Sequence, residues 1–170
     1  MLIRNLDPDQ DRAALIALQT EAQDYWHLAE GGCNPVEKAA AFFTDCPPNC
    51  DPADSHHLGL FQNYAGQPVL SGIAELSFGF PTRQDAYLGL MLLAPRLRGQ
   101  GAGALLLTEV EQRARAAGSP NLYLAVLDTN PRGRSFWQRE GFTPTGLSRR
   151  DADSSILLHR LCKSLIKPAG

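Results

Sequence analysis

The chain has 170 residues and a mass of 18.5 kDa; 44% of the residues are apolar, 20% are charged, and the net charge is −2. These values are typical of one globular domain and exclude a disordered chain. A chain so close to neutrality has no general field that attracts nucleic acid or an anionic membrane. No apolar stretch reaches the ~18 residues of a membrane span, and the charged N-terminus lacks a signal-peptide core. We therefore expect a cytoplasmic protein.

The first 56 residues predict one strand and two helices. A short strand at residues 2–4 precedes a helix that begins at Asp7, with Pro8 at its first position, and continues to Tyr25. A second helix begins at Asn34, where the same start signal recurs. Its expected buried side consists of Val36, Ala39, Ala40 and Phe43. Residues 44–56 are rich in Pro, Asp, Asn and Cys, which predicts a loop.

The middle of the chain predicts a hairpin and then a buried strand. Two apolar segments, 57–63 and 68–78, flank a turn at 64–67, as expected of antiparallel strands. The nearly continuous apolar run 87–93 indicates a central strand covered on both faces.

A helix over 102–117 follows that strand. Its expected core face is Leu106, Val110, Ala114 and Ala117, and two ion pairs lie outside, Glu109 with Arg113 and Glu111 with Arg115.

The remaining segments complete a mixed α/β pattern. They predict a strand at 121–127, a helix from the turn at 128–131 to residue 140, and two closing strands at 142–147 and 154–161.

The cysteines do not indicate a disulfide framework, because Cys33, Cys46, Cys50 and Cys162 are too few for a chain of this size. We expect reduced thiols. A metal-binding protein organised by the first three cysteines and His56 remains an alternative, although the spacing of Cys46 and Cys50 is unusual for zinc. We expect no metal.

A glycine-rich turn at the end of the buried strand carries the clearest chemical signal. Gly99, Gly101 and Gly103 alternate where the strand passes into a helix. The unpaired N–H groups of a helix start favour a phosphate or pyrophosphate, and glycines let it approach. Arg96 and Arg98 can add charge-assisted contacts. The turn lacks the Lys of a P-loop and the spacing of a dinucleotide fingerprint.

Two motifs resemble one known family. Arg96-x-x-Gly99-x-Gly101-Ala102 is similar to the R/Q-x-x-G-x-G/A signature of the GNAT superfamily of acetyl-CoA-dependent N-acetyltransferases. Asn130, followed by the run from Ser135 to Phe142, resembles the second cofactor motif of that family. The resemblance covers about residues 2–161. It implies a mixed α/β (α+β) fold, with a central sheet of six to seven strands flanked by about four helices. It also implies a single domain over 1–165 and a short tail over 166–170.

The resemblance also implies where acetyl-CoA, the cosubstrate, binds. Backbone groups of the strand before the signature pair with the pantetheine arm, at Met91, Leu92 and Leu93. The pyrophosphate lies on the turn formed by Arg96, Arg98, Gly99, Gln100, Gly101, Ala102 and Gly103. Asn130 binds the cofactor arm, and Ser135, Phe136 and Trp137 border it. A backbone N–H near Leu90 or Met91 polarises the thioester carbonyl.

The implied reaction is direct attack of a primary amine on the acetyl thioester, which needs a base to remove a proton from the amine. Glu75 is our first candidate because it interrupts an apolar segment; Asp85 and His57 are the others. Many family members carry a Tyr, which protonates the leaving thiolate, where this chain has Trp137. An indole has no acidic proton at useful pH, so the thiolate leaves unassisted or another residue such as Tyr123 supplies the proton.

The acceptor is expected between the first helices and the late strands, where Tyr25 and Trp26 offer aromatic surface. The charged residues of the final hairpin, Arg149, Arg150, Asp151 and Asp153, are expected in a solvated turn. We expect a small-molecule or peptide amine as acceptor and leave a homodimer open. A non-catalytic module that binds coenzyme A is an alternative function, as is an acyltransferase that uses another acyl-CoA.

Overall fold

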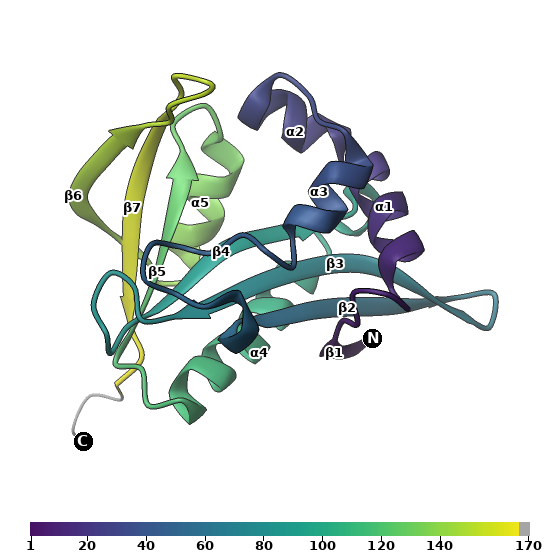
Figure 1. Ribbon diagram of the computed structural model, residues 1–170, viewed down its shortest axis with the longest axis horizontal. Helices are drawn as coiled ribbons and strands as arrows, with labels where there is room; N and C mark the ends of the chain where they lie inside the picture. Colours follow the sequence, from purple (N-terminus) through teal and green to yellow (C-terminus); the bar gives the residue numbers. More distant parts are fainter. Residues whose placement is uncertain (167–170) are drawn as a thin grey trace.

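Seven strands form one mixed sheet in the computed structural model, which describes residues 1–166 (Figure 1). The strand order is β1-β2-β3-β4-β5-β7-β6, and only the pair β4–β5 is parallel. The strands are β1 (Leu2–Asn5), β2 (His56–Tyr64), β3 (Gln67–Phe78), β4 (Ala86–Leu93), β5 (Asn121–Leu127), β6 (Thr143–Arg150) and β7 (Leu157–Ser164). The expected mixed sheet is confirmed.

Five α-helices accompany the sheet in the described residues, against the four or so expected: α1 (Arg12–Glu21), α2 (Gln23–Glu30), α3 (Pro35–Ala41), α4 (Ala102–Ala116) and α5 (Pro131–Arg139). The extra helix arises because the single helix expected up to Tyr25 is interrupted at Ala22. Of the expected tail over 166–170, all but Ile166 lies outside the described residues. Within residues 1–166, no helix is long and apolar enough to cross a membrane.

The sheet is covered on both faces by separate apolar cores. One core joins α4 and Trp137 of α5 to strands β2–β5, and the other joins α1, α2 and α3 to the opposite face. Figure 1 shows α4 below the sheet and α1–α3 above it. Because β4 contributes Leu88 to the first core and Leu92 to the second, its apolar run is explained by burial on both faces.

Three details of the helices differ from the expectations. Val36 and Ala40 are exposed, and α3 instead buries Ala39, with Phe42 just after its end. Ala117 is exposed because α4 ends one residue earlier. Both expected ion pairs of α4 form, but the Glu111 side chain is buried and also binds Lys163, so that pair does not lie outside.

The closing strands also lie later in the chain than expected. β7 begins three residues after the predicted start, because residues 151–156 form the turn of the hairpin.

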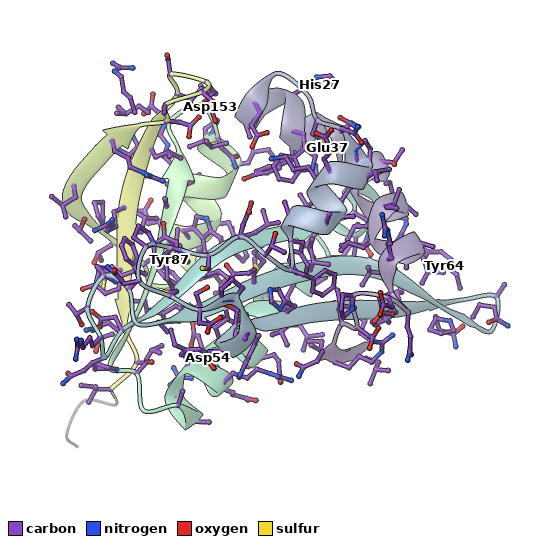
Figure 2. The ribbon with its side chains drawn as sticks, viewed as in Figure 1. His27, Glu37, Asp54, Tyr64, Tyr87 and Asp153 are labelled. Carbon is purple, nitrogen blue, oxygen red and sulfur yellow. The ribbon has the colours of Figure 1, made fainter. Side chains whose placement is uncertain are left out.

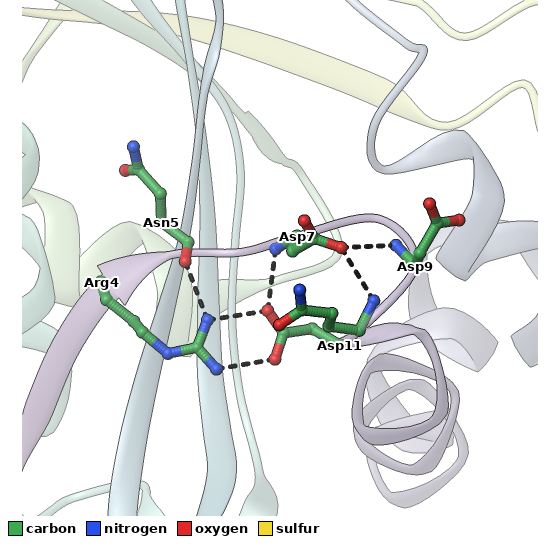
Figure 3. Close-up of polar contacts among 6 residues, drawn as sticks. Arg4, Asn5, Asp7, Asp9 and Asp11 are labelled. Atoms are coloured by element: carbon green, nitrogen blue, oxygen red, sulfur yellow. Dashed lines mark hydrogen bonds and ion pairs between the residues drawn. The ribbon is translucent and has the colours of Figure 1, made fainter.

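The first helix begins at Arg12 rather than at Asp7, and a polar network explains the difference (Figure 3). The Asp7 carboxylate accepts hydrogen bonds from the backbone N–H groups of Asp9 and Gln10, which forms a turn instead of a helix cap. The Asp11 carboxylate accepts two hydrogen bonds of 2.7 Å from the Arg4 guanidinium and one of 2.8 Å from the Asp7 N–H. The network therefore ties β1 to the start of α1.

We predict that Asp11→Asn lowers the free energy of unfolding by about 1–2 kcal/mol at pH 7. The substitution removes the charge that pairs with Arg4, and the half-exposed Arg4 side chain limits the effect through solvent screening. The Arg4 hydrogen bonds are the main cause that lowers the pKa of Asp11, so its contribution is present above pH ~4 and is lost as the pH falls through the lowered pKa.

Urea denaturation at pH 7 and at pH 3 measures the effect. Asp9→Asn is the matched control, because it removes the same charge two residues away, at an exposed position. Equal stability of the two variants at pH 7 contradicts the assigned role of the Arg4–Asp11 pair.

Candidate active site

Strands β4 and β5 pair for only three residues and then separate. The parallel register joins Ala86–Leu88 to Leu122–Leu124, and no further pair forms between these fully described strands. On its other edge β4 carries a bulge, because Glu75 of β3 pairs with Leu90 while Leu76 pairs with Leu88. Gly89 is therefore the extra residue. The bulge lies where β4 leaves its parallel neighbour, so one edge of its following residues is available to a ligand.

A small cavity of about 60 Å³ occupies this separation. Its wall combines the two diverging strands with one residue of α2 and two residues at α5. The lining residues are Tyr25, Leu88–Met91, Leu124–Leu127, Asn130 and Trp137.

A larger cavity of about 650 Å³ lies next to it, between the α2–α3 segment and the β6–β7 hairpin. This volume is within the usual range for small-molecule sites. Figure 2 shows His27 of α2 and Asp153 of the hairpin turn on opposite sides of the space between these elements, with Tyr87 further down on the sheet. Tyr25, Gly89, Leu90, Ala125 and Leu127 line both cavities, so the two meet at the β4 bulge.

Glu75 lies at this junction. Its side chain lines the larger cavity, is only 5% exposed, and lies so close to Gly89 that a Cβ there would be 2.1 Å from Oε2. The Ser77 hydroxyl donates a hydrogen bond to the carboxylate, and Ser55 contacts Ser77 at 2.9 Å. Burial raises the pKa of Glu75 to about 7, while the bond from Ser77 acts in the opposite direction. This value suits a group that accepts a proton at neutral pH.

The other two candidate bases lie outside both cavities. Asp85 is buried and accepts hydrogen bonds from Thr82 Oγ1 at 2.7 Å and Asn121 Nδ2 at 3.0 Å. The His57 ring packs against the rings of Phe42 and Phe43, and burial lowers its pKa. The structure therefore brings Glu75, and neither Asp85 nor His57, to the cavity wall.

The glycine turn has an open conformation at the start of α4. Gly99 and Gly101 have φ values of +75° and +82°, which L side chains rarely adopt, and a Cβ at either position would meet nothing within 4 Å. Ala102 and Gly103 form the first residues of α4. A Cβ on Gly103 would come within 3.2 Å of Phe136, so this glycine allows α4 and α5 to approach. An uncovered turn of this shape fits a pyrophosphate group.

The two arginines of the signature contact carboxylates of the first helices. Arg98 pairs with Asp24 and donates from Nε to the Leu93 carbonyl at 3.1 Å. Arg96 pairs with Glu21 at 3.1 Å. The Gln100 amide donates to the Arg96 carbonyl, which closes the turn. Both arginines thus fix the turn to α1 and α2, whether or not they also contact phosphate.

The second motif forms the opposite wall of the small cavity. Asn130 caps α5, with its Oδ1 accepting from the Gly133 N–H at 2.9 Å. Trp137 is buried between Phe136 and Phe142, with edge-on ring contacts to both. Ser135 is exposed and lines neither cavity. Tyr123, the expected alternative proton donor, also lies outside both cavities.

The acceptor residues expected from the sequence, Tyr25 and Trp26, do line the larger cavity. Sequence reasoning missed much of the opposite wall. Arg149 and Asp151 were expected in a solvated turn, but they line the cavity together with Arg160, Tyr87 and Phe80 of other elements. The apolar periodicity of β6 and β7 does not indicate that these residues line a cavity, because the wall forms only when the β6–β7 hairpin folds toward α2.

The thiols show no metal-site geometry in the described residues. No group of three or more His, Cys, Asp or Glu side chains converges among residues 1–166. All four cysteines are unpaired there, and burial raises the pKa of Cys46 and Cys50.

Comparison with solved structures supports the fold. A GCN5-related N-acetyltransferase from Kribbella flavida matches with a TM-score of 0.69 and 18% identity over 96% of both chains. The ribosomal-protein-S18-alanine N-acetyltransferase from Escherichia coli gives 0.67 and 16% over 99% of this chain and 96% of its own. An aminoglycoside 6'-acetyltransferase type Ii gives 0.69 and 15% over 99% of this chain and 100% of its own.

A family comparison covers the segment that contains the glycine turn and every residue that lines the smaller cavity. The model of the acetyltransferase (GNAT) family matches residues 16–142. Since this match spans most of the chain, the protein belongs to the GNAT family of acetyltransferases.

Proposed function

We propose that this protein transfers an acetyl group from acetyl-CoA to the nitrogen of a primary amine. One observation carries the proposal: a buried carboxylate with a pKa of about 7, Glu75, lies where the larger cavity meets the separation of β4 and β5. The amine occupies the larger cavity, and the acetyl thioester reaches it through the smaller one.

The chain offers a binding path for acetyl-CoA that runs from the turn to the junction. The open turn of Gly99, Gln100 and Gly101 receives the pyrophosphate, with the first N–H groups of α4. The β4 edge at Met91–Leu93 pairs with the pantetheine arm, and Asn130 and Trp137 border it from α5. When bound, acetyl-CoA supplies the activated acetyl thioester.

Glu75 accepts the proton that the amine must lose before or during attack. The cavity brings the two reactants together, which replaces an encounter in solution with a local, oriented one. Leu90 lines both cavities, and its N–H is our candidate donor to the carbonyl oxygen on which negative charge develops.

The acceptor class follows from neither structural neighbour. One neighbour is named for a protein N-terminal alanine and another for an aminoglycoside, and both share only the fold with this chain. Our proposal therefore specifies a primary amine. A cytoplasmic location and a homodimer stay predictions of the sequence.

We predict that the protein releases coenzyme A from acetyl-CoA only when a suitable amine is present, and that Glu75→Gln reduces turnover about 10²–10⁴-fold, the range for loss of a general base. The measurement is chromatographic detection of coenzyme A against a panel of polyamines, aminoglycosides, amino acids and peptides. A thiol dye is unsuitable because the four cysteines would react. Binding of acetyl-CoA by the wild type without turnover on any amine favours the non-catalytic module instead.

We predict that Ser77→Ala moves the acid limb of the pH–kcat/KM profile to higher pH. Removing the hydroxyl takes away a hydrogen bond that lowers the pKa of Glu75, so the carboxylate ionises only above about pH 7. Activity falls most near pH 7 and recovers at pH 9. Ser119→Ala is the control: it removes a buried hydroxyl that follows the end of α4 and lines neither cavity. Equal midpoints in the two variants contradict the role of Ser77.

We predict that Gly101→Glu abolishes acetyl-CoA binding while the fold survives. The side chain fills the open turn and places a negative charge against the pyrophosphate. Gly118→Glu is the matched control, because Gly118 has a φ of +81° and equally open surroundings but lies at the far end of α4. Calorimetric titration with acetyl-CoA and thermal unfolding of both variants separate strain from lost binding. Unchanged affinity in folded Gly101→Glu rejects the phosphate site.

A further inference from the structure

One tyrosine side chain lines the smaller cavity. The cavity volume of about 60 Å³ corresponds to about two water molecules. Tyr25 reaches this wall from α2, and Trp137 reaches it from α5.

Tyr25 is the only residue lining the small cavity, within the described chain, whose side chain carries an ionisable O–H. The strand residues around it are aliphatic or glycine. Asn130 uses its Oδ1 to cap α5, and Trp137 has an indole N–H with no acidic proton at useful pH. Tyr25 also lines the larger cavity, so it lies beside the path that joins them.

We propose that Tyr25 is a catalytic residue whose phenol donates a hydrogen bond to the sulfur as the thioester bond breaks, and so takes the place of the tyrosine that many family members carry at the position of Trp137. This inference rests on the acetyl transfer proposed above. The carbon–sulfur bond breaks, its electron pair passes to sulfur, and the carbon–nitrogen bond forms. Glu75 takes the proton that nitrogen loses, and coenzyme A leaves as a thiolate that accepts a hydrogen bond from the Tyr25 O–H. Water then protonates the thiolate and takes the proton from Glu75.

The surroundings of Tyr25 suit this role. Burial raises its pKa to about 12, so the phenol keeps its proton and acts as a hydrogen-bond donor to the developing thiolate. The ring makes an edge-on contact with Trp26, with 5.0 Å between centroids. Trp26 is itself held by a 2.8 Å hydrogen bond from its Nε1 to Oε1 of buried Gln19. The phenol ring therefore packs against a fixed part of the cavity wall.

The first test needs no turnover. A donor beside the sulfur stabilises the thiolate form of bound coenzyme A, and free thiols ionise near pH 8–9. We expect the ratio of the dissociation constants at pH 7 and pH 9, measured by calorimetry, to be about tenfold larger for the wild type than for Tyr25→Phe, the size of one hydrogen bond to a charged group. An analogue of coenzyme A without the sulfur shows no such difference.

Tyr87→Phe is the matched control for this measurement. Tyr87 also has a pKa raised by burial, but it lines only the larger cavity. We expect the ratio of its dissociation constants for coenzyme A at pH 7 and pH 9 to equal that of the wild type.

The second test places a tyrosine at position 137, where many family members carry one. We expect Tyr25→Phe to lower kcat, and the double variant Tyr25→Phe/Trp137→Tyr to recover it, because the new phenol enters the same small cavity from α5. Acetyl-CoA affinity at pH 7 monitors the packing of each variant.

The outcomes separate the two proposals. If the pH 7 to pH 9 ratio of dissociation constants for coenzyme A is the same in the wild type and in Tyr25→Phe, the role of Tyr25 is overturned, even when the wild type acetylates an amine. The wild type can show the expected ratio of dissociation constants and yet acetylate no amine. That result refutes acetyl transfer and still supports the contact between Tyr25 and sulfur.

Discussion

The contact between the Glu75 carboxylate and the backbone of Gly89 is the constraint on which the site depends. A side chain at position 89 would overlap the carboxylate, and Gly89 is also the extra residue of the β4 bulge. The bulge reverses which side of β4 faces each core, so Leu88 and Leu92 lie on opposite faces despite an even spacing. It also marks the end of pairing with β5. One residue without a side chain therefore brings together a buried carboxylate, a strand separation and the junction of two cavities.

A buried carboxylate at this position opposes folding. With a pKa raised from 4.5 to about 7, Glu75 binds a proton in the native state over a pH range in which the unfolded chain has released it. The native state consequently loses stability relative to the unfolded chain as the pH rises across this interval. The protein tolerates that cost because two large apolar cores lie on either side of the sheet, while Ser77 and Ser55 satisfy the carboxylate.

The sequence predicts the strands and the glycine turn well, because local signals determine them. Alternating apolar residues and the turn at Gly66 define the β2–β3 hairpin, and the cap at Asn34 forms as expected. The start of α1 could not be predicted, since it depends on the pairing of Asp11 with Arg4 of the preceding strand. The cavity wall around Arg149 and Arg160 could not be predicted either, because it forms only when the β6–β7 hairpin takes its place in the fold. Glu75 was identifiable because a carboxylate in an apolar strand needs a special environment.

The ion pair between Arg98 and Asp24 has a consequence for how ligands affect one another. Asp24 immediately precedes Tyr25 in α2, so the pair connects the glycine turn to the wall of the larger cavity. An anion that competes with Asp24 for Arg98 leaves an unneutralised carboxylate beside that wall, where it attracts a cationic amine. Such coupling is thermodynamic and reciprocal: if one ligand strengthens the binding of the other, the second strengthens the first by the same factor.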